Sequence, residues 1–548
     1  MSLTSSLGET YSNATPNGNS GYLYINNQPP VDLVRGSTTN TLSMTFGTND
    51  PANVQYSGAW IDFNGNGVFE ASETIAMATS PATSNASVTY TFSIPAGASL
   101  GQKRIRLRGG SDTAYTNAGA CNTSIYGDTE DYNVNIVDSS ISNNYTWNVN
   151  VNSNWQIASN WSPNGIPTTF DNITIASGTN NLNITDNRTI NNFALNGNLN
   201  MAANSNLIIR GNVSYNGSAA ANLNCASKIE IRSASSQTIP PFNYGTLDAT
   251  GGNRTLPSTG VVGICNTFNP GAGSYTITGS TVNYFSPTAA NSYTLSSFNY
   301  HNLTFSGVAT FTLGQGNTIN VQGNYTQSAG FVNLTNFTTG SNTMNVDGDL
   351  NITGGTLNMN ANTTAGATSV INLKGDLTVS GAGKLDASQG NNTGKDFNFN
   401  GIGNGTSASQ IQSVNVAFPD AARNRRIQFY AKPGSYVQLS RDFDLGDNSR
   451  FYVEGGSVLD FGFTGTTPNN ITGNGRVATD FTASAGAYLK ISSPQGVSNT
   501  VGAVGNIRTT NNPSFAASTF HYIGKVNQSY GYGHWKWTQR KCCDCGAI

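Results

Sequence analysis

Short runs in which apolar and polar residues alternate dominate this sequence. One version recurs four times: an alternating run, a Gly, an Asn or Asp, and a second alternating run. The copies are LIIRGNVSY from Leu207, TINVQGNYTQ from Thr318, TMNVDGDLNI from Thr343 and VINLKGDLTV from Val370. A period of two is typical of a strand with one buried face, and Gly permits a bend. Each copy is therefore predicted to form two short strands, with the Gly as the bend residue.

A longer spacing also repeats. The segments KIEIRSASSQTIPPFNYGTL (residues 228–247) and TVNYFSPTAANSYTLSSFNYHNL (residues 281–303) align as strand, turn, strand and Phe-Asn-Tyr, which places Tyr244 and Tyr300 56 residues apart. In a degenerate later copy Arg441 stands where the Gly is expected. Repeats of this kind predict stacked β units that bury a continuous apolar ladder.

The first 138 residues lack this repeat. Their alternating runs are separated by Asn, Gly and Pro clusters, and they are TLSMTF (41–46), SGAWIDF (57–63), SVTYTFSI (87–94), RIRLR (104–108) and DYNVNIV (131–137). Short strands in a segment of this length are typical of an antiparallel β-sandwich. The alternation in KRIRLRG places Arg104, Arg106 and Arg108 on a solvated strand face, opposite a buried apolar face.

One turn in this segment has the spacing of a calcium-binding loop. The stretch DFNGNGVFEASE reads D-x-N-x-N-G, then five residues, then Glu. We predict that calcium is held by Asp62, Asn64, Asn66, the backbone carbonyl of Val68, Glu70 and Glu73. A strand precedes the loop, so it differs from a helical EF-hand, and we expect a dissociation constant on the order of 10⁻⁴ to 10⁻³ M. A metal-free hairpin is the alternative, because Asn-Gly pairs are strong turn formers.

The order of motifs in this segment resembles a known family. WIDFNGNGVF, FSIPAGASLGQKRIRLR, Cys121 and GDTEDYNVNI follow one another as in the GEVED domain, named for a Gly-Glu-Val-Glu-Asp string that Gly127 to Asp131 approximates. Asp128 and Thr129 stand where the name has Glu and Val. The resemblance covers about residues 40–138. It implies an accessory module of secreted or cell-surface bacterial proteins, many from Bacteroidota, and an adhesin-like context without a defined ligand.

A tryptophan-rich segment opens the repeat region. Residues 147–175 resemble the opening segment of long bacterial β-repeat surface proteins, in which a Trp-rich turn precedes a strand. Trp155 and Trp161 are either a sugar-stacking pair or buried aromatic residues at the domain entrance, and we favour the second interpretation.

The low content of charged residues argues against some classes of binding partner. Only 10% of the 548 residues are charged and the net charge is −2, so no basic field for nucleic acid is expected. No apolar run approaches the ~20 residues of a transmembrane helix. The start, MSLTSSLGET, lacks a signal-peptide pattern, so we expect a cytosolic chain or one without its export signal.

Residues for catalysis are sparse. The three histidines His301, His521 and His534 are isolated, and Asp442 and Asp444 are interpreted as solvated positions on one strand face. We therefore expect no enzyme. Cys121, Cys225 and Cys265 are free, buried or paired, and three more cysteines crowd into the final residues.

Together these patterns predict an all-β protein. Its parts are an antiparallel, GEVED-like β-sandwich with a calcium-type loop (1–138), a β-solenoid similar to a right-handed β-helix (139–534, with units near 228–280, 281–360, 410–462 and a partial unit at 518–533), and an atypical tail that is disordered or artefactual (535–548). We expect a secreted or cell-surface structural and adhesive fragment that binds glycans or cell-surface components. A carbohydrate-binding accessory region, a polysaccharide-cleaving β-helix and an inert stalk are the alternatives.

Overall fold

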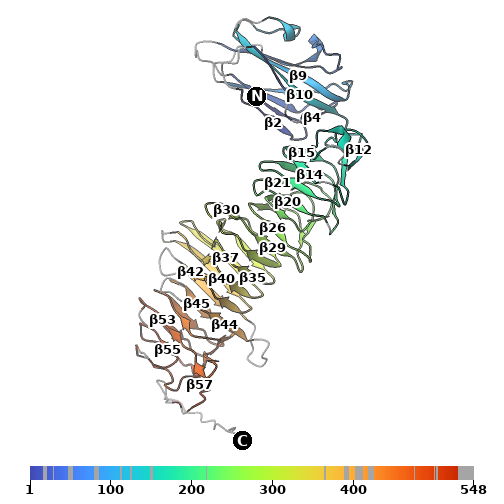
Figure 1. Cartoon of the computed structure of the whole chain (residues 1–548). Coiled ribbons are helices and arrows are strands. Elements are labelled where there is room, and N and C mark those ends of the chain that lie inside the picture. The colour runs from blue at the N-terminus through green and yellow to red at the C-terminus, as the bar shows by residue number, and fades with distance from the viewer. Residues whose placement is uncertain are drawn as a thin grey trace. The chain divides into compact units, whose positions relative to one another are not determined.

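The regular secondary structure of the chain is almost entirely β-strand in the part that the computed structural model describes. This part covers residues 1–528 except 16–20, 27, 29, 47–53, 79–85, 112–113, 124–125, 149–151, 180, 218, 363–365, 388–393, 402–410, 418–424, 474–475, 499, 502–503 and 527 (Figure 1). The only helices there are three 3₁₀ turns, η1 (Ala71–Glu73), η2 (Gly119–Cys121) and η3 (Ala158–Asn160). Among the described residues no helix is long and apolar enough to cross a membrane.

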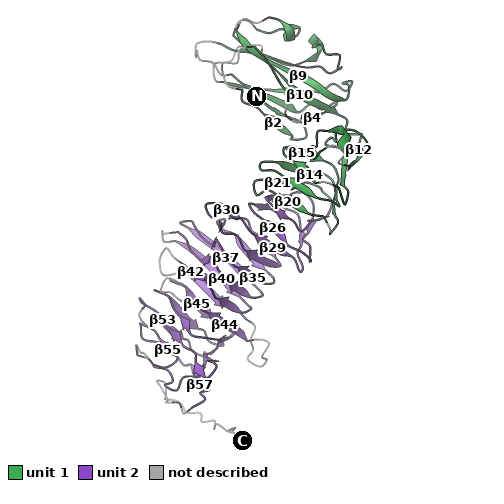
Figure 2. Ribbon diagram, viewed as in Figure 1, with its two compact units in different colours: residues 1–235 green, residues 236–548 purple. Residues whose placement is uncertain are grey.

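Two compact units make up the chain, residues 1–235 and residues 236–548 (Figure 2). The predicted tail at 535–548 lies outside the described residues. The other domain boundaries proposed from the sequence remain predictions.

The first unit begins with two sheets around one core. The four-stranded sheet has the order β2-β1-β5-β8, and in the six-stranded sheet β3-β10-β9-β6-β7 form a path on which β4 also pairs with β10. These strands are β1 (Ser2–Thr4), β2 (Thr10–Ser12), β3 (Gly21–Ile25), β4 (Val31–Val34), β5 (Asn40–Thr45), β6 (Tyr56–Ile61), β7 (Thr74–Met77), β8 (Ser87–Phe92), β9 (Gly101–Gly110) and β10 (Gly127–Val137). All five alternating runs singled out in the sequence lie on strands of these sheets.

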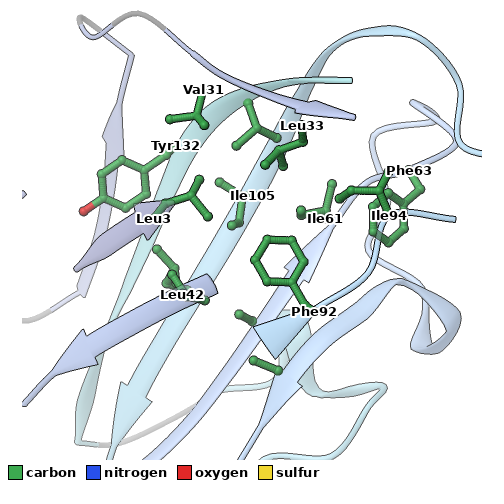
Figure 3. Packing of buried hydrophobic residues seen from close by; sticks show 14 of the residues in the cluster. Leu3, Val31, Leu33, Leu42, Ile61, Phe63, Phe92, Ile94, Ile105 and Tyr132 are labelled. Atoms are coloured by element: carbon green, nitrogen blue, oxygen red, sulfur yellow. The ribbon is translucent and has the colours of Figure 1, made fainter. Parts of the chain in front are cut away.

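The two sheets bury their apolar faces against each other. Leu3 and Leu42 from the four-stranded sheet lie in one cluster with Ile61 and Ile105 from the six-stranded sheet (Figure 3). All four side chains are at most 1% exposed. Most strand pairs are antiparallel, but β10 pairs in parallel with both β3 and β4.

The polar face of β9 differs from its predicted solvated state. Arg104 is exposed as predicted, but Arg106 is half-buried and Arg108 is only 4% exposed. The Arg108 guanidinium donates a 2.6 Å hydrogen bond to the carbonyl of Gly119 and lies 4.8 Å from the ring centroid of Tyr115. The segment that contains η2 therefore covers this face, which alternation along one strand could not indicate.

Parallel sheets occupy the rest of the first unit. β11 pairs in parallel with β13 and antiparallel with β12. From β13 to β21, consecutive strands join three sheets in turn, through the pairings β13-β16-β19, β14-β17-β20 and β15-β18-β21. Their bounds are β11 (Asn144–Trp147), β12 (Trp161–Ser162), β13 (Asn172–Ile175), β14 (Leu182–Ile184), β15 (Asn187–Ile190), β16 (Phe193–Leu195), β17 (Leu199–Met201), β18 (Asn206–Ile209), β19 (Val213–Tyr215), β20 (Ala221–Leu223) and β21 (Lys228–Ile231).

Three parallel sheets, here called the five-, nine- and twelve-stranded sheets, contain most of the described strands of the second unit. The five-stranded sheet holds β30 (Ser292–Leu295), β33 (Thr310–Leu313), β36 (Phe331–Asn333), β39 (Thr356–Asn358) and β42 (Lys384–Asp386). The nine-stranded sheet holds β31 (Phe298–Tyr300), β34 (Thr318–Val321), β37 (Gly340–Val346), β40 (Ala367–Leu373), β43 (Lys395–Phe399), β45 (Gln428–Ala431), β48 (Arg450–Val453), β53 (Asp480–Ala483) and β56 (Ser514–Phe515). The twelve-stranded sheet holds β23 (Asn243–Tyr244), β26 (Val262–Ile264), β29 (Thr281–Tyr284), β32 (Asn302–Phe305), β35 (Tyr325–Gln327), β38 (Leu350–Ile352), β41 (Leu377–Val379), β44 (Gln412–Val416), β46 (Tyr436–Leu439), β49 (Val458–Asp460), β54 (Tyr488–Ile491) and β57 (Thr519–Tyr522).

From β30 to β44 the strands follow a fixed order. In each group of three, here called a triplet, the first strand joins the five-stranded sheet, the second the nine-stranded sheet and the third the twelve-stranded sheet. Equivalent positions on the nine-stranded sheet are 21, 25, 27 and 26 residues apart in successive triplets. The structural repeat is therefore shorter than the 56-residue spacing, and Tyr244 and Tyr300 lie on different sheets.

Inward-facing residues of successive triplets form continuous apolar rows. One row on the nine-stranded sheet contains Ile319, Met344, Ile371, Phe397, Phe429, Phe451 and Phe481, which are in register and at most 1% exposed. This arrangement explains why the cassette alternates, because every second residue must enter the row.

The cassette Gly has a different role from the predicted one. In three copies it lies at the corner between a strand of the nine-stranded sheet and a strand of the twelve-stranded sheet. Gly323, Gly348 and Gly375 have no positive φ, but a Cβ at each position would collide with atoms of the preceding triplet. The residue after the Gly caps the next triplet: Asn324 Oδ1 accepts from the Asp349 amide at 2.8 Å, and Asp349 Oδ1 from the Asp376 amide at 2.9 Å. The Gly therefore permits close approach of the chain and is not required for a bend.

Replacing a corner Gly should therefore destabilise the second unit. In Gly375→Ala the new methyl group would meet the backbone of Gly348, which is held by the triplet below it. We expect a loss of about 1–3 kcal/mol, the usual cost of overpacking, measured by guanidinium chloride unfolding. Gly217→Ala is the control, because its Cβ would meet open space at an ordinary φ. Equal stability of the two variants would contradict the close-approach role.

Candidate functional site

The predicted calcium loop connects β6 to β7 through η1. The buried carboxylates of Asp62 and Glu73 lie at its two ends, at 7% and 3% exposure. Asn64 and Asn66 are exposed between them, and Val68 is 57% exposed. Gly65 and Gly67 have φ values of 74° and 83°, so the two Asn-Gly pairs form the tight turn that the motif requires.

Hydrogen bonds gather the loop's oxygen atoms. Asp62 Oδ1 accepts from the amide of Gly65 at 2.8 Å and Oδ2 from the amide of Gly67 at 2.9 Å. The side-chain amides of Asn64 and Asn66 both donate to the Glu70 carboxylate, at 2.8 and 2.7 Å. The loop thus brings together the carboxylate and amide oxygens that the calcium motif names.

The closing acid completes the arrangement. Glu73 accepts from the backbone amides of Asn64 and Glu70, at 3.2 and 3.1 Å, and burial raises its pKa. Among the described residues no group of three or more His, Cys, Asp or Glu side chains is placed to hold a metal ion. A calcium ion here would therefore depend on the two Asn oxygens and a carbonyl as well as on the carboxylates, which is a donor set that suits calcium.

The acidic string at the start of β10 has a structural role. Asp131 is fully buried and forms a bidentate ion pair with Arg106, at 2.7 and 2.8 Å. The hydroxyl of Tyr22 on β3 donates to the same carboxylate at 2.8 Å. Asp131 therefore joins three neighbouring strands of the six-stranded sheet, and its oxygens have partners within the protein.

The tryptophans that open the repeat region are buried. Trp155 and Trp161 are 3% and 2% exposed, and their ring centroids lie 4.7 Å apart. Trp161 also packs edge-on against Trp147 at 4.9 Å. The favoured interpretation is confirmed, and the alternative of a sugar-stacking pair is wrong because both side chains are buried and pack edge-on against each other.

The other acids, histidines and cysteines singled out in the sequence do not lie together in one site among the described residues. Asp442 Oδ1 accepts from the backbone amide of Asn470 at 2.8 Å, and Asp444 forms a 2.7 Å ion pair with Arg476. They are thus engaged in local contacts and are not simply solvated. His301 and His521 lie on separate parts of the fold, and His534 lies outside the described residues. Cys225 and Cys265 are disulfide-bonded, whereas Cys121 is free.

The sequence analysis missed a pair of acids, of which Asp32 is buried and Glu9 is half-buried. Glu9 accepts a 2.9 Å hydrogen bond from the backbone amide of Asp32, and Asp32 accepts a 2.7 Å bond from the amide of Thr169. Thr169 is separated from Asp32 by 137 positions, so no local pattern could reveal the contact. The pair links the two-sheet module at the start of the first unit to its parallel sheets.

Burial and mutual repulsion disfavour charge on both acids. Burial, followed by the charge of Glu9, raises the pKa of Asp32 to about 7. Burial also raises the pKa of Glu9. Arg188 and Arg210 lie close enough to oppose these shifts without cancelling them. The folded first unit therefore holds a proton that an unfolded chain would release at lower pH.

A row of asparagines on the nine-stranded sheet was also missed. Asn320, Asn345 and Asn372 share one outward position of the cassette, three residues before the Gly. Their side chains line a cavity of about 430 Å³ together with residues that follow the same strands. The signal for this row lies in the polar positions of the cassette, where Asn recurs three residues before the Gly in three copies.

The acid pair should make stability depend on pH. Because the folded state binds more protons than the unfolded state between pH 3.8 and about 7, its stability should fall as pH rises through this window. Glu9→Gln removes the like charge, so we expect a flatter slope and a gain of about 1 kcal/mol at pH 8. Thermal melts at pH 5 and pH 8 measure both effects.

A second variant in the same module, Asp138→Asn, should change stability in the opposite direction. Hydrogen bonds from Ser140 lower the pKa of Asp138, so Asp138→Asn should reduce stability at neutral pH.

For the acid pair, a pH dependence of stability in Glu9→Gln that is identical to that of the parent chain would contradict the role of Glu9 and Asp32.

Comparison with known proteins identifies one part of the chain. No curated protein and no solved structure matches it. The family model of the GEVED domain matches residues 56–135. This range runs from β6 through the calcium-type loop to β10, and it includes the string at Gly127–Asp131. Residues 56–135 are therefore similar to a GEVED domain.

Proposed function

We propose that this protein is an extracellular or cell-surface structural and adhesive protein whose repeat region is a β-solenoid. The observation that carries the proposal is the fixed order of strand triplets from β30 to β44, which feed the same three parallel sheets. When triplets stack in this way, each outward position recurs along the sheet. The region therefore presents rows of identical groups to a partner. The right-handed sense of the solenoid remains a prediction.

Three further features support an extracellular setting. The GEVED domain is consistent with a secreted or cell-surface protein, in a context like that of Bacteroidota adhesins. Cys225 and Cys265 are disulfide-bonded, and disulfides persist in oxidising compartments. The chain has few charges and relies on amides and hydroxyls for its polar surface, which suits hydrogen bonding to glycans more than binding of nucleic acid.

Attachment assays test this proposal. Beads that carry the full chain should attach to bacterial cells or immobilised cell-wall glycans more than beads with the heat-denatured chain. Failure to attach to any surface would favour an inert stalk. Release of reducing sugar from a polysaccharide would overturn our expectation that the protein is not an enzyme and would favour a polysaccharide-cleaving β-helix.

We also propose that the loop from Asp62 to Glu73 binds calcium. The motif spacing, the loop amides that bond to Asp62 and Glu73, and the two positive-φ glycines support this assignment. Calcium would stiffen the connection between β6 and β7 and offset the repulsion between neighbouring carboxylates. The ion would have a structural role.

Titration calorimetry of the full chain should show calcium binding with a dissociation constant on the order of 10⁻⁴ to 10⁻³ M. Glu73→Gln removes the bidentate carboxylate and should abolish the heat of binding. Glu454→Gln, which removes an acid from the second unit, is the matched control. Absence of both heat and a rise in melting temperature at millimolar calcium would contradict the proposal and favour the metal-free hairpin.

A further inference from the structure

The outward face of the nine-stranded sheet has a continuous row of side-chain amides. One Asn from each of five successive strands stands in register, and the members are Asn299, Asn320, Asn345, Asn372 and Asn398. From Asn320 onward, each side-chain nitrogen donates to the oxygen of the preceding Asn, at 2.7, 2.7, 2.8 and 2.8 Å. We call this set the amide row; it belongs to the strand series that includes β37 and β40 in Figure 1.

The amide row keeps hydrogen-bonding capacity for a ligand. An Asn nitrogen carries two hydrogens, and within the row it uses one of them. The oxygen likewise has two lone pairs, and those of Asn299, Asn320 and Asn345 accept one bond from the row. Asn372 Oδ1 accepts two bonds, from Asn398 and Asn400. These side chains are exposed or half-buried. The row thus offers a donor at each step and an acceptor at every step except Asn372, already fixed in direction by its own hydrogen bonds.

A second row of residues makes one wall of a groove along the amide row. Two positions further along each strand lie Gln322, Asp347, Lys374 and Asn400, and the groove has a volume of about 430 Å³. Asp347 and Lys374 form a 2.7 Å ion pair with side chains about half exposed. The groove is therefore polar with balanced charge, and it lacks the single-sign field that a polyanion would need.

The spacing of the groove restricts its ligand further. Neighbouring strands lie ~4.8 Å apart, so five of them span about 19 Å. One sugar ring of an extended β-linked chain advances by a similar length. Beyond Asn398 the same position is taken by Tyr430 and Tyr452, whose rings stack at 4.8 Å. The amide row therefore ends at the aromatic pair.

We infer that this groove binds a linear, uncharged polysaccharide lying along the amide row, with hydroxyl groups bonded to successive Asn side chains. The inference rests on the proposed function and names the ligand class and the surface. A regular polymer suits a regular row because successive sugars meet side-chain amides at the same spacing. Binding by many equivalent weak contacts also fits adhesion, where multivalency supplies strength.

Affinity electrophoresis of the full chain tests the inference. Gels that contain mixed-linkage β-glucan or glucomannan serve as uncharged probes, and alginate serves as a polyanion. We expect at least one uncharged polymer to retard the protein and alginate not to do so. Retardation by alginate alone, or by none of the three, would overturn the inference.

Variants locate the binding surface. Asn345→Ala with Asn372→Ala interrupts the amide row, and Gln322→Trp fills the groove from an exposed position without touching the row. Each should weaken retardation at least tenfold. Asn351→Ala is the matched control, because Asn351 is a partly exposed residue of β38 on the twelve-stranded sheet. Melting curves and circular dichroism verify that all variants fold.

The outcomes separate this inference from the proposed function. If the groove variants retain full retardation, the groove is not the site, while bead attachment can still support an adhesive role. If the parent chain shows neither retardation nor attachment, both proposals are wrong. Loss of retardation in the double variant and in Gln322→Trp, with Asn351→Ala unchanged, would support the groove as the binding site.

Discussion

Parallel register between successive strands is the constraint on which the repeat region depends. Because equivalent strands of neighbouring triplets pair without slippage, a residue on one triplet lies directly beside its counterpart on the next. Inward positions become the apolar row from Ile319 to Phe481, and outward positions become the amide row. A shift of one residue would exchange the two faces, so the buried apolar row holds the polar row in place.

The same constraint sets the chemistry of the corners. Successive corners lie on top of one another, so each leaves little room for a side chain, and Gly satisfies that demand at Gly348 and Gly375. The Asn or Asp that follows has the complementary task of accepting the next triplet's backbone amide. The recurring Gly-Asn or Gly-Asp motif is therefore explained by the stacking of corners. A binding function is more naturally sought on the outward rows.

The two-sheet module follows a different principle. Here charged groups are buried and neutralised within the fold, as in the Arg106–Asp131 pair, while Glu9 and Asp32 are held together at a cost that protonation relieves. Removing one partner of the Arg106–Asp131 ion pair would cost more than the pair contributes, because the other charge would be left buried and unpaired. In the loop at Asp62–Glu73 the two end carboxylates are buried, whereas Asn64 and Asn66 between them are exposed.

Alternation and turn residues in the sequence determined the strands, their inward residues and the motif spacing of the loop, because these depend on neighbours along the chain. The order of motifs also determined the GEVED resemblance, which the match to residues 56–135 confirms. Tertiary structure alone decided which strands pair, the 21- to 27-residue triplet spacing, the burial of Arg108, and the contact of Asp32 with Thr169. Those features arise between residues far apart in sequence, where packing and close approach, rather than local propensity, set the outcome.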